Sequence, residues 1–379
     1  MFVELHMIQN FAPANLNRDD TNNPKDCEFG GVRRARISSQ CIKRAIRISP
    51  VFQQTTAVDR GTRTRWLTRL LTGELVKAGK AEADANTVAA AFAAEYAGKM
   101  GDGGRTSVLL YLSAEELTSF AAQILGHWDE ILAASKPDDK AQKNPAVEAI
   151  VKGLIKQTKD RTSAPDIALF GRMLADKPEL GLDAACQVAH AISTHRVNME
   201  MDFFTAVDDL QQKEEPGAGM MGIIGFNSAT FYRYARIDWD QLVRNLNGDR
   251  DLAQRTVEGF LRASVAAVPT GKQNSFAAQN PPSFLLAVVR DDGVSWSLAN
   301  AFEKPVQARH EGLVEPSVQA LDAYWGDLCR VYGNGSQRTV AALTLDGALS
   351  LKNLDAALVP DLETWVGQVL AALPQEAGA

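Results

Sequence analysis

Residues 25–47 read KDCEFGGVRRARISSQCIKRAIR, and this stretch decides how the fold begins. A short strand is predicted around Val32 to Arg36, and a helix over Gln40 to about Arg47, capped by Ser38 or Ser39. Pro50 is expected to stop the helix. A strand that leads into a helix is a building block of mixed α/β structure, so the neighbouring segments decide the fold class.

The chain on either side of this stretch predicts an α+β fold. Phe2–Ile8 is typical of a half-buried strand, because Glu4 and His6 alternate with apolar residues. Later strands are predicted at Ser283–Arg290 and near Thr339–Leu345. Helices are predicted at Arg65–Ala78, Asp84–Ala97, Ala114–Leu132, Pro145–Lys156, Asp183–Ile192, Asp249–Val268, Pro316–Val331 and Leu362–Leu373. Strands at both ends around a helical middle indicate a sheet domain interrupted by a helical insertion at residues 60–180.

A long hairpin is predicted after Thr194, where the hydrophobic period changes to two. One face carries Val197, Met199, Met201, Phe203 and Thr205, and the return strand is expected at Ser228–Asp238. Between the strands, Gln211–Asn227 is rich in glycine, which predicts a mobile tip. Phe204 lies on the otherwise polar face with Glu200 and Asp202. Its ring could stack on a base, or could turn into the core or a subunit contact, and the pattern leaves these open. On the return strand, aromatic side chains alternate with Arg233 and Arg236.

The net charge of −6 hides a strong segregation. Residues 29–73 hold ten basic side chains and one acidic side chain, and the remainder of the chain is acidic. Six of these cations lie between Arg33 and Arg47 with no acid among them, and Lys43, Arg44 and Arg47 can share one helix face. With the amides at the helix N-terminus beside Ser38, Ser39 and Gln40, this pattern favours phosphate-backbone binding over a merely solvated helix face.

Other candidate groups carry weaker signals. The loop Asn15–Lys25 supplies Arg18, Lys25 and several asparagines. Its Asp19 and Asp20 lack a third ligand, so they are expected to pair with arginines or stabilise turns rather than hold a metal. Lys152, Lys156 and Lys159 would form a stripe if their helix continued, and a solvated face is the expected explanation. Lys272 lies in the loop Thr270–Asn274.

The sequence contains no catalytic or metal motif, so we expect neither an enzyme nor a cofactor. His190 and His195 are five residues apart, a poor spacing for two ligands on one helix, and each is predicted to be a polar group at an element boundary. The four cysteines lack a C-x-x-C pairing and are expected to be reduced thiols. Without a signal peptide or a membrane-spanning apolar run, a cytoplasmic protein is expected.

Motifs along nearly the whole chain resemble the CasC family. They are NRDD at Asn17–Asp20, the stretch Lys25–Arg47 quoted above, ALFGRM at Ala168–Met173, AHAISTH at Ala189–His195, FFTAVDDL at Phe203–Leu210, FYRYARI at Phe231–Ile237 and LANAFEKPV at Leu298–Val306. This family is the RNA-binding backbone subunit of the type I-E CRISPR Cascade surveillance complex, an antiviral defence complex.

The resemblance implies a hand-shaped protein. An RRM-like (ferredoxin-like) palm would comprise residues 1–59, a helix at 181–195 and residues 239–379, with helical fingers at 60–180 and a hairpin thumb at 196–238. Copies would stack as a helical filament on CRISPR RNA, beside the other Cascade subunits, and present its bases to target DNA.

The resemblance also implies residue roles. The backbone grip would involve Arg18, Lys25, Ser38, Gln40, Lys43, Arg44 and Arg47. Lys272 is a candidate RNA contact from its place in the loop Thr270–Asn274 and not from the resemblance. A kinked nucleotide would be flanked by Met173, Phe204 and Thr205. Lys152, Lys156 and Lys159 would meet target DNA.

Two departures are visible: Phe203 stands where tryptophan is expected, and the tip is longer and richer in glycine than expected. Two alternatives to the non-catalytic backbone subunit stay open. One is a related subunit that cuts RNA with a metal ion and Asp19 or Asp20. The other is a stand-alone module for single-stranded nucleic acid.

Overall fold

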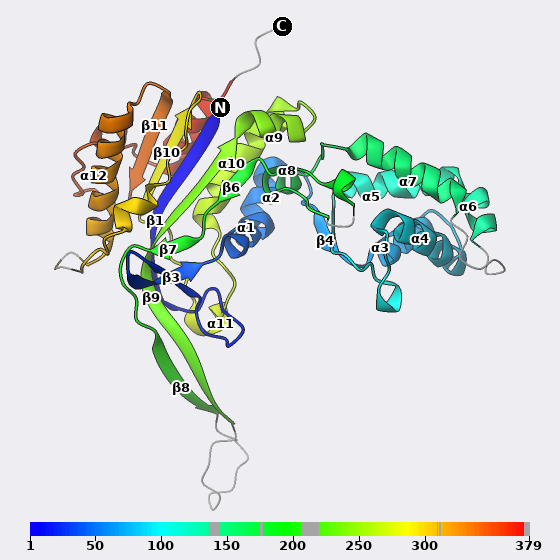
Figure 1. Cartoon of the computed structure of the whole chain (residues 1–379), viewed down its shortest axis with the longest axis horizontal. Coiled ribbons are helices and arrows are strands. Elements are labelled where there is room, and N and C mark those ends of the chain that lie inside the picture. Colours follow the sequence, from blue (N-terminus) through cyan, green and yellow to red (C-terminus); the bar gives the residue numbers. More distant parts are fainter. Residues whose placement is uncertain (136–143, 175–176, 207–219, 309, 311, 375–379) are drawn as a thin grey trace, which may run out of the picture. The chain divides into compact units, whose positions relative to one another are not determined.

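The computed structural model describes residues 1–135, 144–174, 177–206, 220–308, 310 and 312–374, and it is drawn in Figure 1. The chain forms two compact units. Unit 1 comprises Met1–Phe52, Gln187–Ile237 and Val257–Ala379, and unit 2 comprises Gln53–Cys186 and Asp238–Thr256. The mixture of helices with an antiparallel sheet confirms the predicted α+β class.

Unit 1 is built on an antiparallel sheet with the strand order β11-β10-β1-β9-β7-β3-β2. These strands are β1 (Phe2–Ala14), β2 (Asp26–Phe29), β3 (Val32–Ile37), β7 (Ala191–Ser193), β9 (Met220–Asp238), β10 (Phe284–Arg290) and β11 (Gln337–Thr344). The first strand was predicted to be half-buried, and this is wrong: Glu4 and His6 are fully buried. Glu4 accepts a hydrogen bond from Arg290 at 2.8 Å, which compensates its burial.

Apolar helical segments cover the sheet. Helix α12 (Val314–Tyr332) and the 3-10 helix η3 (Leu298–Phe302) share a core with Tyr232, Phe284 and Leu286. Helix α13 (Leu362–Ala371) contacts β10 and β11, and its Trp365 indole donates to the Ala341 carbonyl at 3.0 Å. The remaining helices that lie in unit 1 or extend into it are α1 (Ser39–Ile48), α2 (Pro50–Thr56), α10 (Arg250–Ala266), α11 (Gln273–Phe276) and η4 (Asp355–Ala357).

The predicted hairpin is confirmed. Strand β8 (Glu200–Ala206) pairs antiparallel with the first part of β9, and the register sets Phe203 opposite Ile223 and Phe204 opposite Gly222. Every side chain of β8 is exposed. The mobile tip predicted for Gln211–Asn227 is wrong for Met220–Asn227, because these residues belong to β9, so the return strand begins before the predicted Ser228. The rest of the predicted tip falls on residues that lie outside the described ones.

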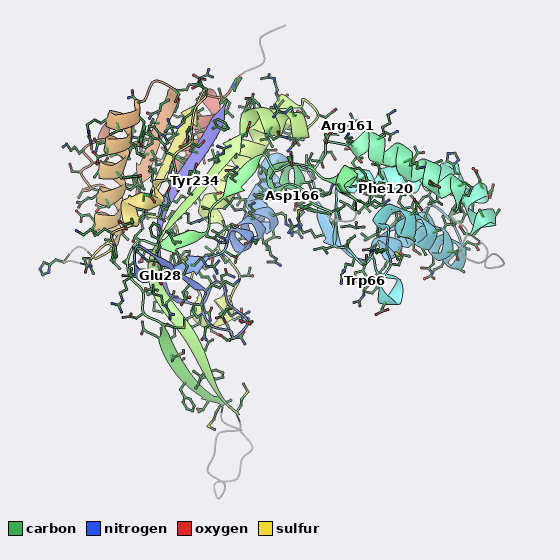
Figure 2. The ribbon with its side chains drawn as sticks, in the orientation of Figure 1. Glu28, Trp66, Phe120, Arg161, Asp166 and Tyr234 are labelled. Carbon is green, nitrogen blue, oxygen red and sulfur yellow. The ribbon has the colours of Figure 1, made fainter. Side chains whose placement is uncertain are left out.

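Unit 2 is mainly helical. Its apolar core contains Phe92, Tyr96 and Phe120, whose rings pack with centroids 4.9–6.0 Å apart, and Figure 2 shows Phe120 among these helices. The helices are α3 (Leu67–Lys77), α4 (Glu82–Ala97), α5 (Ala114–Gly126), α6 (Trp128–Ala134), α7 (Pro145–Thr158), α8 (Pro165–Phe170), α9 (Trp239–Asn245), η1 (Asp102–Gly104) and η2 (Pro178–Leu180). A small two-stranded sheet pairs β4 (Thr62–Thr64) with β5 (Leu110–Leu112).

Two helix predictions need correction. The helix predicted at Asp183–Ile192, and with it a palm helix at residues 181–195, is wrong, because the chain forms β6 (Cys186–Val188) and β7, which both pair with β9. The backbone amide of Ala189 donates to the Tyr234 carbonyl at 2.9 Å, so sheet hydrogen bonds replace helical ones. The single helix predicted at Ala114–Leu132 is broken at His127 into α5 and α6.

Candidate nucleic-acid interface

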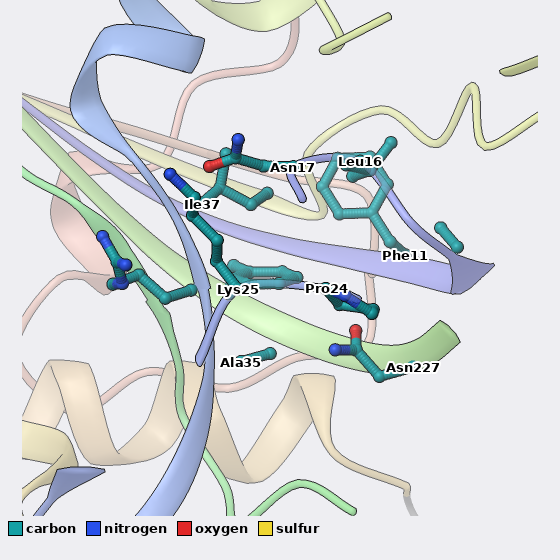
Figure 3. A pocket seen from close by; sticks show the side chains of 11 residues that line it. Phe11, Leu16, Asn17, Pro24, Lys25, Ala35, Ile37 and Asn227 are labelled. Carbon is teal, nitrogen blue, oxygen red and sulfur yellow. The ribbon is translucent and has the colours of Figure 1, made fainter. Parts of the chain in front are cut away.

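The loop before β2 is tied to the N-terminus of α1. The Asn17 carbonyl accepts a hydrogen bond from the Lys25 amide at 2.9 Å, and the Asn17 side chain accepts one from the Ser38 amide at 2.8 Å. Lys25, Asn17 and Ile37 line one small cavity, shown in Figure 3. Its volume of about 20 Å³ suits one water molecule and excludes a nucleotide base. This cavity is therefore a packing feature and not a binding site for a nucleotide.

The predicted cap of α1 is confirmed, and Ser38 is the capping residue. Its hydroxyl accepts a hydrogen bond from the Cys41 amide at 3.3 Å. The Ser39 amide donates to Nδ1 of His190 at 3.1 Å. Gln40 is exposed, and among the described residues its backbone amide is the donor of the first helical turn that has no hydrogen-bond acceptor. The prediction that several amides are free at this helix terminus is therefore wrong, because the amides of Ser39 and Cys41 already donate to acceptors inside the protein.

The cations of α1 flank its buried side. Ile42, Ala45 and Ile46 are buried, Arg44 is exposed, and Lys43 and Arg47 are half-buried. The helix contains no acidic residue. Burial raises the pKa of the Cys41 thiol, and the positive charges of Arg44 and Lys25 oppose this rise. The positive charges of Arg44 on α1 and of Lys25 in the preceding loop therefore both act on the Cys41 thiol.

Three arginines at the start of the basic run make contacts within the protein, and one of them, Arg34, is buried. Arg34 is fully buried and donates to the carbonyls of Ser193 at 3.2 Å and Phe302 at 2.8 Å. Arg33 pairs with Asp26 at 3.2 Å, and Arg36 donates to the Asp26 carbonyl at 3.1 Å. The cationic surface predicted for residues 33–47 is thus smaller than the sequence indicates.

Of the two acidic residues in the loop, Asp19 has the predicted turn-stabilising role. Asp19 accepts hydrogen bonds from the amide and hydroxyl of Thr21 and from the Asn23 amide at 2.8–3.0 Å. The hydroxyl of Thr21 is the main cause that lowers the pKa of Asp19. Asp20 and Arg18 are exposed beside it. Among the described residues, no group of three or more His, Cys, Asp or Glu side chains could hold a metal ion.

Lys272 lies on a loop that packs on the loop before β2. A Cβ at Gly271 would lie 2.3 Å from the Leu16 carbonyl oxygen, so the two backbones are in close contact. Lys272 itself has a left-handed φ of 49° and is half-buried. The structure therefore brings the loop of Lys272 against the segment between Asn15 and Lys25.

The hairpin presents Phe204 and Thr205 to solvent. Phe204 is 40% exposed, which rules out the alternative in which its ring turns into the core. The ring lies across Gly222, where a Cβ would be only 2.4 Å from it. Phe203 is 62% exposed on the opposite face. An aromatic ring held on the open surface of a strand is available to stack on a base or on a partner protein.

Met173 belongs to unit 2, so its relation to Phe204 and Thr205 stays a prediction. It is 91% exposed and lines an open cleft with Arg63, Asp160 and Phe170. The adjacent Arg172 is buried and donates to Glu116 at 2.7 Å and to the Leu180 carbonyl at 2.7 Å. This buried pair fixes the turn that exposes Met173.

The lysine stripe of unit 2 is only partly formed. Lys152 pairs with Glu148 at 2.6 Å, and this carboxylate raises the pKa of Lys152. Lys156 is exposed on the same helix. Lys159 has extended backbone angles and follows the end of α7 at Thr158, so the helix does not continue to it.

Sequence reasoning missed two residues of this interface. Asn17 joins the loop to the start of α1 by its hydrogen bonds, and the high asparagine content of the loop is the sequence feature that indicates such a role. His190 was placed at an element boundary, which is confirmed, but its bond to Ser39 was not foreseen. His195 is also at a boundary: its ring hydrogen-bonds the Arg196 carbonyl at 2.8 Å and the Thr230 amide at 3.1 Å.

The family model described as CT1975-like protein matches residues 3–365, and the chain belongs to this family. Two solved structures are similar to it over 98% of the chain and 100% of their own. One, from a "CRISPR RNA-guided surveillance complex, pre-nicking", has 32% sequence identity and a TM-score of 0.84. The other, from a "CRISPR RNA-guided surveillance complex", has 26% identity and a TM-score of 0.73. The resemblance to the CasC family is therefore confirmed. No curated protein matches the chain. No helix of the described residues is long and apolar enough to cross a membrane.

Proposed function

We propose that this protein is a non-catalytic RNA-binding backbone subunit of a CRISPR surveillance complex of type I-E. The observation that carries the proposal is the end-to-end match, at 32% identity, to a chain of an RNA-guided surveillance complex. The cationic surface of α1 and the loop before it support the same function, because phosphate contacts hold a nucleic acid without reading its sequence. Base pairing would then supply the specificity for the target.

In this function, unit 1 acts as an RRM-like palm with the β8–β9 hairpin as a thumb, and unit 2 supplies the fingers. Copies of the chain stack along the CRISPR RNA as a helical filament and contact the other subunits of the complex. The RNA backbone is held by Arg18, Lys25, Ser38, Gln40, Lys43, Arg44, Arg47 and Lys272. Met173, Phe204 and Thr205 flank a kinked nucleotide, and Lys152, Lys156 and Lys159 face target DNA.

The structure lends most support to the cations of α1 and least to two of the other assignments. The Ser38 hydroxyl is already used in the helix cap, so its contact with RNA would come from another atom or require a shared hydrogen bond. Lys152 is already paired with Glu148, which reduces its attraction for DNA. Arg44 and Gln40 are exposed at α1 and are free of this conflict.

The test is to purify the full complex and sequence the RNA that accompanies it. Discrete RNAs flanked by CRISPR repeat sequence are expected. Heterogeneous RNA, or none, would favour the stand-alone single-strand module instead.

A second arm addresses catalysis. The assembled complex is incubated with RNA complementary to its guide and a divalent metal ion. We expect no site-specific cuts. Cuts that disappear in Asp20→Ala would replace the proposal with the metal-dependent nuclease.

A further inference from the structure

The side chain of His190 is exposed beside the N-terminus of α1, and among the described residues only its Nδ1 has hydrogen-bond partners. Nδ1 accepts from the Ser39 amide at 3.1 Å and lies 3.5 Å from the guanidinium of Arg36. Both neighbours can only donate, so Nδ1 must carry a lone pair. In the neutral ring the proton is then on Nε2, which has no hydrogen-bond partner among the residues that the structure describes.

The surroundings keep this ring neutral. Burial lowers the pKa of His190, and the positive charges of Arg36 and Lys25 lower it further. The backbone that carries the ring is fixed by sheet pairing, since Ile192 is opposite Arg36 and the Ala189 amide donates to Tyr234. His190 is therefore a pre-oriented N–H donor among cations.

We propose that His190 donates this N–H to an oxygen of the RNA backbone, as a binding residue of the same surface as Lys25 and Gln40. The inference rests on the proposed function, since it needs RNA on this surface. A neutral donor suits two backbone oxygens, the phosphate oxygen and the ribose 2′-hydroxyl, and both belong to the same strand. The neighbouring cations would hold the strand, and His190 would fix its register.

The test separates a contact with RNA from a role in capping α1. In His190→Asn the amide oxygen takes the place of Nδ1 and still accepts from Ser39, but the distal donor is lost. In His190→Ala both are lost. Affinity of the full chain for guide-length single-stranded RNA is measured together with thermal stability. We expect both variants to bind at least fivefold more weakly, as for a lost hydrogen bond to an anionic or hydroxyl oxygen. His127→Asn, an exposed histidine of unit 2, is the control and should bind normally.

Wild-type affinity in His190→Asn would overturn the proposal and leave His190 as a capping residue only. RNA with 2′-deoxy substitutions distinguishes the two acceptors. If the loss in His190→Asn vanishes on this ligand, the acceptor is the ribose hydroxyl, and if it persists, the acceptor is the phosphate. Failure of the proposed function looks different: charge reversal at Lys43 and Arg47 would then leave RNA binding unchanged as well.

Discussion

The basic runs at residues 33–47 and 152–159 resemble each other in sequence and differ in their surroundings. The helix of the first run, α1, contains no acidic residue. In the second run, Lys152 is paired with Glu148 and Lys159 lies beyond the end of α7. An exposed ion pair stabilises a protein only weakly, but it reduces the local positive potential. The number of cations is thus a poor guide to an anion-binding surface, and the position of nearby carboxylates is a better one.

The largest effect is expected inside the first run, at Arg34, which is the fully buried arginine of that run. Arg34→Gln would leave the buried carbonyls of Ser193 and Phe302 without a donor. Each such loss costs about 1–3 kcal/mol, so we expect about 3 kcal/mol or more in the free energy of unfolding, measured by denaturant titration. Arg44→Gln, at an exposed position of the same run, should change stability by less than about 0.5 kcal/mol. Equal losses in the two variants would contradict this division of roles.

The next prediction tests directly whether the first basic run, at residues 33–47, binds RNA. Lys43→Glu with Arg47→Glu should weaken RNA binding by about 100-fold, uniformly across RNA sequences. Two lost phosphate contacts would flatten the slope of log affinity against log salt by about 1.4. The measurement is a salt series of binding titrations.

The matched variant for that experiment is Lys152→Glu with Lys156→Glu. It should leave RNA affinity within about threefold of wild type, because one of its lysines is already neutralised by Glu148. If both double variants lose affinity equally, the two basic runs bind RNA alike and the comparison fails.

A smaller effect is expected at the hairpin, which tests whether the grip extends beyond the basic runs. Phe204→Ala should reduce assembly of the RNA-bound complex by about tenfold, since stacking on a base is worth about 1–3 kcal/mol. The melting temperature should change by less than about 2 °C, because the ring is 40% exposed. A large loss of thermal stability would instead show that the ring supports the fold of the hairpin.

The smallest effect concerns pH. Burial lowers the pKa of both His190 and His195 below the ordinary value of 6.5. As pH falls through 6.5, the unfolded chain therefore binds protons before the folded chain does, and this favours unfolding. The stability from these neutral rings is present above pH 6.5 and is lost towards the lower folded pKa. We expect the melting temperature to fall between pH 7.5 and 5.5, and to fall less in His195→Gln. An unchanged slope in that variant would contradict the assignment.

The sequence predicts the fold well where the cause is local. Ser38 caps α1 as expected, and α4, α7 and α10 begin and end within two residues of their predicted bounds. Prediction failed at Asp183–Ile192, where alanines favour a helix but two short strands form instead. Their hydrogen bonds go to β9, more than 30 residues later, and no local pattern reports such a partner.

The candidate interface was predictable in its charge and not in its geometry. Arg34 and Arg44 are the same residue type ten positions apart, yet one is fully buried and the other exposed. What separates them is the carbonyl of Phe302, a contact that spans 268 positions in the sequence. His190 was similarly hidden, because its bond to Ser39 joins segments 151 positions apart.

Asn17 accepts two hydrogen bonds, from the amides of Lys25 and Ser38, and these have a consequence for the thermodynamics of ligand binding. They tie the loop to the helix before any ligand arrives, so the conformational entropy of this surface is lost during folding and not during binding. Under the proposed function, the ordering cost that remains is that of the flexible RNA strand. A protein surface prepared in this way should show a small heat-capacity change from its own segments when RNA binds, and little change in amide hydrogen exchange within residues 15–41.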